Sequence, residues 1–66
     1  METTFRIASE TYAEKTRRLL TRQQIPFRVQ RTTTPQGCAA KFHVSASPEY
    51  LAVLLRTHQI PFHMDA

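Results

Sequence analysis

The sequence is poor in the residues that build common catalytic and metal sites. It has one cysteine (Cys38), one glycine (Gly37) and no tryptophan among its 66 residues. A lone cysteine excludes an internal disulfide and a paired-cysteine zinc motif, which favours a reducing compartment, and we predict a cytoplasmic protein. Glycine-rich phosphate loops, serine nucleophile elbows and His-Glu-x-x-His runs are absent as well. We therefore predict a non-enzymatic protein that uses no cofactor and no metal.

Long apolar runs are also lacking. No segment approaches the roughly 20 apolar residues that cross a bilayer, and the first residues do not have the pattern of a signal peptide, so we expect no membrane partner. A chain of this length forms one domain at most, here residues 1–66, and it buries only about 60% of its unfolded surface. A deep catalytic cleft is therefore not expected. Self-association as a homodimer is expected, because a core of this size stabilises a fold only weakly.

An internal repeat is the most informative feature that the sequence does contain. The segment LLTRQQIPFRV, from residue 19, recurs as LLRTHQIPFHM from residue 54, an offset of 35. Two copies are too few for a solenoid stack. We predict a domain of two pseudo-twofold halves, about 1–31 and 32–66, each a β-α-β unit.

The spacing of apolar residues supports this division. It predicts a strand at 4–8, a helix at about 11–24 that begins at a capping box of Thr11 and Glu14, and a second strand from Phe27. Residues 32–37 are predicted as a loop, followed by a strand from Ala40. A second helix begins at Ser47 as N-cap, and a last short strand lies near 62–64.

These elements predict an α+β fold of βαββαβ order. Right-handed crossovers give a four-stranded antiparallel sheet with both helices on one face, the ferredoxin-like arrangement. The strand residues expected to face the helices are apolar: Phe5, Ile7, Phe27, Val29, Ala40, Phe42, Val44, Phe62 and Met64.

The uncovered face of this sheet is predicted to be basic. Alternation sends Arg6, Arg28, Lys41, His43 and His63 to it, in a chain of net charge +4. One interpretation is an ordinary solvated face. The other is a surface for nucleic acid or another polyanion, because clustered cations displace counterions from phosphates. All four phenylalanines fall on the helix side, so base stacking and sequence-specific RNA binding are weakly supported.

Cys38 is the other candidate site. It follows Gly37 in the predicted central loop, and Arg31 and Lys41 are near it in the chain, where positive charge favours a thiolate. A thiolate there could hold a sulfur or selenium atom. The alternative is a small buried hydrophobe at the start of a strand. The residues alone leave both open.

The chain resembles a known family over nearly its whole length. A short strand precedes a helix with Ala13-Glu14-Lys15 and Leu19-Leu20, then Ile25-Pro26-Phe27-Arg28-Val29, a loop with Pro35 and Cys38, and a second strand-helix unit. This order resembles the selenium/sulfur carrier-like proteins, small bacterial domains of unknown function. The resemblance implies that Cys38 receives sulfur or selenium and passes it to a partner protein. The competing hypothesis is a binding module without chemistry, either a ligand-sensing regulatory domain or an anion-binding surface.

Overall fold

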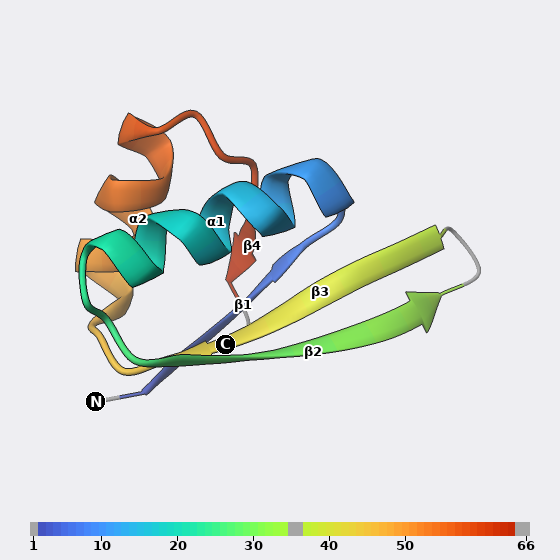
Figure 1. Ribbon diagram of the computed structural model, residues 1–66, viewed down its shortest axis with the longest axis horizontal. Helices are drawn as coiled ribbons and strands as arrows, with labels where there is room; N and C mark the ends of the chain where they lie inside the picture. Colours follow the sequence, from blue (N-terminus) through green and yellow to red (C-terminus); the bar gives the residue numbers. More distant parts are fainter. Residues whose placement is uncertain (1, 35–36, 65–66) are drawn as a thin grey trace.

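The computed structural model describes residues 2–34 and 37–64 as an α+β fold with two helices above one sheet (Figure 1). The elements run β1 (Thr3–Ile7), α1 (Glu10–Arg22), β2 (Phe27–Thr34), β3 (Gly37–Val44), α2 (Pro48–Thr57) and β4 (His63–Met64). The four strands lie in the order β2-β3-β1-β4, and all neighbours are antiparallel. This arrangement is compatible with a ferredoxin-like fold. None of the helices that the structure describes has the length and hydropathy to cross a bilayer.

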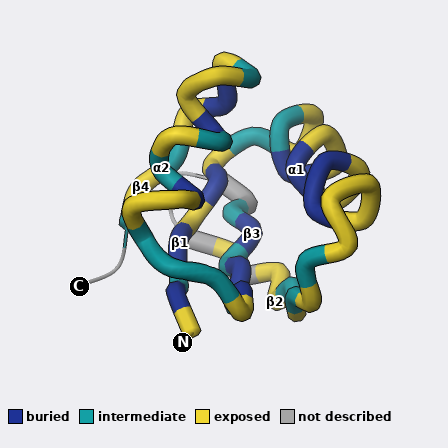
Figure 2. The backbone as a smooth tube through the Cα atoms, turned by 90° about the vertical axis from the view of Figure 1, so that its left-hand side faces the viewer, coloured by how far each residue is buried: buried dark blue, intermediate teal, exposed yellow. Residues whose placement is uncertain are grey.

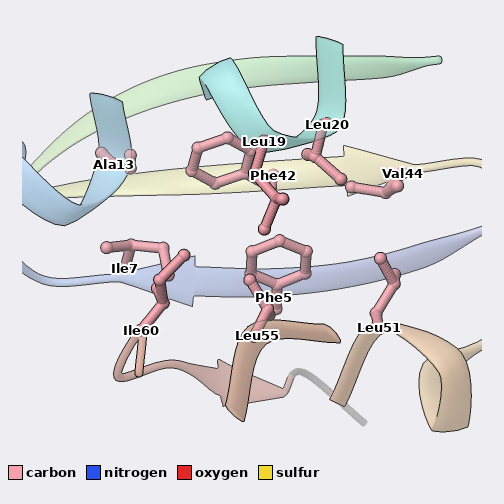
Figure 3. Packing of buried hydrophobic residues seen from close by; sticks show 11 residues of the cluster. Phe5, Ile7, Ala13, Leu19, Leu20, Phe42, Val44, Leu51, Leu55 and Ile60 are labelled. Atoms are coloured by element: carbon pink, nitrogen blue, oxygen red, sulfur yellow. The ribbon is translucent and has the colours of Figure 1, made fainter. Parts of the chain in front are cut away.

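The core lies between the sheet and the two helices (Figure 2). Phe5 of β1 and Phe42 of β3 stack at its centre, with ring centroids 5.1 Å apart and planes inclined by 6°. Leucines of both helices close over these rings (Figure 3). The predicted helix-facing set is confirmed: Phe5, Ile7, Ala40, Phe42 and Val44 are buried, and Phe27, Val29, Phe62 and Met64 are partly buried against them.

The first helix ends in a Schellman motif. Gln24 has a left-handed backbone with φ of 58°. The amide of Ile25 donates to the carbonyl of Leu20 at 3.0 Å, and the amide of Gln24 donates to the carbonyl of Thr21 at 3.0 Å. These bonds satisfy carbonyls that the helix end leaves unpaired, and Pro26 prevents further helix.

The second helix ends in the same way. Gln59 also has φ of 58°. The amide of Ile60 donates to the carbonyl of Leu55 at 2.9 Å, and the amide of Gln59 donates to the carbonyl of Arg56 at 3.0 Å. The repeated sequence therefore forms the same local turn at both of its copies.

The predicted start of α2 is confirmed, and the predicted start of α1 is wrong. Ser47 caps α2 as expected, since its Oγ accepts from the amide of Tyr50 at 3.3 Å, and Pro48 is the first helical residue. The capping box at Thr11 is wrong, because α1 begins one residue earlier, at Glu10, with Ser9 as N-cap. Ser9 makes no side-chain cap bond.

The connection between β2 and β3 is shorter than the predicted loop at 32–37. β2 and β3 pair from Phe27 opposite Val44 to Thr34 opposite Gly37, so Cys38 is the second residue of β3, opposite Thr33. The prediction of a loop cysteine is wrong in this respect, since the β-branched run of threonines extends the strand. β1 pairs with β3 only as far as Ile7 opposite Ala40, and the hairpin therefore projects beyond it (Figure 1).

Candidate functional site

Strand register arranges the side chains of the open sheet face in two neighbouring rows. Arg6, near the end of β1, lies opposite Lys41 of β3 on one side and opposite His63 of β4 on the other. Lys41 in turn lies opposite Gln30 of β2. The row His63, Arg6, Lys41, Gln30 therefore crosses the whole sheet.

A second row lies next to the first. His43 of β3 stands opposite Thr4 of β1 and Arg28 of β2. Its Nδ1 lies 3.2 Å from Oγ1 of Thr4, and its Nε2 lies 3.4 Å from Oε1 of Gln30. The ring is thus held from two neighbouring strands, and its side chain is 27% exposed.

We call Arg6, Arg28, Lys41, His43 and His63 the basic face. Arg6, Arg28 and His63 are exposed, while Lys41 and His43 are half-buried. Like charges placed directly opposite on neighbouring strands repel each other, and Arg6 opposite Lys41 is such a pair. A carboxylate lies close to His43: Oε1 of Glu2 is 4.0 Å from Nδ1 of the ring. The face thus concentrates positive charge on the side of the sheet that the helices leave open.

The residues predicted to support Cys38 are not on one face of the sheet. Arg31 lies opposite Ala40 on the helix side, and its Nη1 is 2.7 Å from Oε1 of Glu10 in α1. Lys41 is the next residue after Ala40 in β3, so it alternates to the open face. Gly37 precedes Cys38 in β3, and the side chain of Cys38 lies outside the part that the structure describes.

The sequence pattern predicts the residues of the basic face but not the contacts that hold His43 in place. The contacts of His43 with Thr4, Gln30 and Glu2 join residues 13 to 41 positions apart in the sequence, and they depend on the register of three strands. The alternation that predicts Arg28 on this face also predicts Gln30 there, two residues further along the same strand, and this is the one signal that could have found it. Comparison with family models, with curated proteins and with solved structures finds no match to this chain.

Proposed function

We propose that the protein is a non-catalytic binding module of the cytoplasm, whose basic face binds the phosphate backbone of a nucleic acid. The observation that carries this proposal is the register that places Arg6 between Lys41 and His63. Neighbouring strands lie about 4.8 Å apart, so two cationic side chains and one imidazole fall within about 10 Å. Duplex DNA carries one phosphate charge per about 1.7 Å of helix axis, and a surface of this width therefore meets several phosphates.

The chemistry of the face favours backbone recognition over base recognition. Stacking on single-stranded bases needs aromatic side chains, and the phenylalanines of the sheet pack on its helix side. Contacts to phosphates position a protein but carry no sequence information. We therefore expect binding that is largely independent of sequence and strongly dependent on salt.

Salt titration with charge-neutralised variants tests this function. We expect Arg6→Gln and Lys41→Gln each to weaken binding to a random-sequence duplex and to lower the slope of log affinity against log salt by about 1. Arg22→Gln is the matched control, because it removes one exposed guanidinium from the last turn of α1. No binding at low salt, or an equal loss in the Arg22 variant, would refute the assignment of the basic face.

Sulfur or selenium transfer through Cys38 is a second candidate, favoured by the family resemblance and by one observation. The backbone of Cys38 lies in the projecting part of the β2-β3 hairpin, opposite Thr33, whose side chain is exposed. In this reaction the Cys38 thiolate attacks the outer sulfur of a donor persulfide. A sulfur–sulfur bond forms at Cys38, the donor's sulfur–sulfur bond breaks, and the donor leaves as a thiolate.

Mass spectrometry of the intact protein separates this candidate from the first. Incubation with a persulfide donor should add the mass of one sulfur atom to the native chain and none to Cys38→Ser, whose circular dichroism should match the native spectrum. An adduct that persists in Cys38→Ser, or no adduct in the native chain, would remove the carrier hypothesis and leave nucleic-acid binding untouched.

We also infer that the fold is ferredoxin-like with two pseudo-twofold halves, about 1–31 and 32–66. The identical helix ends at Gln24 and Gln59, 35 residues apart, support this inference. So does the strand order, in which one strand of each half lies at the centre of the sheet and one at its edge.

A further inference from the structure

A cavity of about 400 Å³ lies on the helix side of the sheet, separate from the basic face. Ile7, Ala13 and Ala40 are buried residues of its lining, and the start of α1 and the β2-β3 hairpin form its walls. The space exists because α1 begins only at Glu10, while the hairpin continues past the end of β1 (Figure 1). Small-molecule sites typically have volumes of about 300–1,000 Å³.

The rim of the cavity carries charges of both signs in equal number. Glu10 and Glu14 line it from α1, Arg17 lines it from the same helix, and Arg31 lines it from β2. A ligand with only negative charge would meet two carboxylates, and one with only positive charge would meet two guanidinium groups. The rim therefore favours a ligand that carries one charge of each sign.

The groups at the rim can exchange partners at little cost. Arg31 and Glu10 pair at 2.7 Å between the hairpin and the helix, but their side chains are 73% and 69% exposed. Ion pairs this exposed contribute little to stability, so a ligand can replace either partner. Ser9 also lines the cavity, and because its hydroxyl makes no cap bond with α1, it can donate to a bound carboxylate.

We propose that this cavity binds a small zwitterion with a short aliphatic side chain, the chemical class of the α-amino acids. The ligand carboxylate binds Arg31 and the Ser9 hydroxyl, and the ligand ammonium binds Glu10. The aliphatic side chain rests on the methyl groups of the lining, where Ala13 and Ala40 leave room that larger residues would fill. The proposal does not depend on the basic face.

Titration of the isotope-labelled chain with free valine, followed by amide chemical shifts, tests the proposal. We expect saturable shifts at Glu10, Arg31 and Ala40, with a dissociation constant in the millimolar range or tighter. N-acetylvaline lacks the ammonium and valinamide lacks the carboxylate, and we expect each to bind at least about tenfold more weakly. Glycine, alanine and leucine, titrated in the same way, report the preferred length of the side chain.

Charge variants supply the control. Arg31→Gln and Glu10→Gln change exposed side chains, so the fold should survive, and each should weaken valine binding at least about tenfold. Arg28→Gln, an equal change in the same strand but on the basic face, should leave valine binding unchanged. The proposal is overturned if none of the four amino acids gives a saturable shift up to about 10 mM, a limit that corresponds to very weak binding. It is also overturned if the two derivatives bind as tightly as valine, or if the Arg28 variant loses binding as the Arg31 variant does.

Discussion

Replacing Gln24 or Gln59 with glycine should stabilise the protein. Both residues have φ of 58°, where a side chain brings Cβ too close to the following carbonyl oxygen. That conformation costs a non-glycine residue roughly 1–2 kcal/mol, whereas glycine adopts it readily. Glycine in turn loses about 0.5–1 kcal/mol more backbone entropy on folding. The net gain for each substitution is about 0.5–1 kcal/mol, and the exposed Gln side chains forfeit little packing.

Urea unfolding measures this gain as a higher midpoint with an unchanged slope. In a thermal scan of a domain this small, each kcal/mol raises Tm by roughly 4–8 °C. Gln23→Gly is the matched control, because Gln23 is the adjacent C-cap with φ of −80° and should lose stability with glycine. Because the two sites lie on different helices, the double variant should add both gains. Glycine variants at 24 and 59 that behave like Gln23→Gly would refute the argument from backbone strain.

Three further predictions concern the core, the caps and the ion pair of the cavity rim. Phe42→Ala should cost about 3–5 kcal/mol in urea unfolding, because the ring is 0% exposed and stacks on Phe5, whereas Val53→Ala at a 63% exposed position should cost less than about 0.5 kcal/mol. Ser47→Ala should cost about 1 kcal/mol through loss of the bond to Tyr50, while Ser9→Ala should cost much less, and equal losses would contradict the cap assignment. Arg31→Gln should change the free energy of unfolding by less than about 1 kcal/mol, because its pair with Glu10 is exposed, and a larger loss would show that the pair is structural.

Period-two alternation was sufficient to predict both faces of the sheet. Phe5, Phe42 and Val44 are buried where alternation placed them, and Arg6 and Lys41 are on the open side. The repeat was equally informative, since its two copies form the same helix end. Alternation is a local signal that recurs in several strands, and the repeat is visible from a direct comparison of its two copies.

The errors came from positions where several local signals compete. Thr11 with Glu14 has the spacing of a capping box, but Ser9 also has the right chemistry, and the helix starts after Ser9. Residues 32–37 combine turn formers with β-branched threonines, and the strand preference prevails as far as Thr34.

The pairs of residues that lie opposite each other on neighbouring strands could not be read from the sequence. That Arg6 lies between Lys41 and His63 depends on the register of three strands, which is a long-range property. The cavity depends on where α1 begins and on how far the β2-β3 hairpin extends past the end of β1. Both are boundaries of elements. Boundaries are the least certain part of any prediction from a pattern of residues.

The most direct test of the central claim is to map a short duplex onto the protein by amide chemical shifts at low salt. The proposed function predicts that the shifts gather at Arg6, Arg28, Lys41, His43 and His63, and that added salt removes them together. Shifts that gather instead on α1, at Arg17, Arg18 and Arg22, would contradict the claim and assign binding to the helix layer.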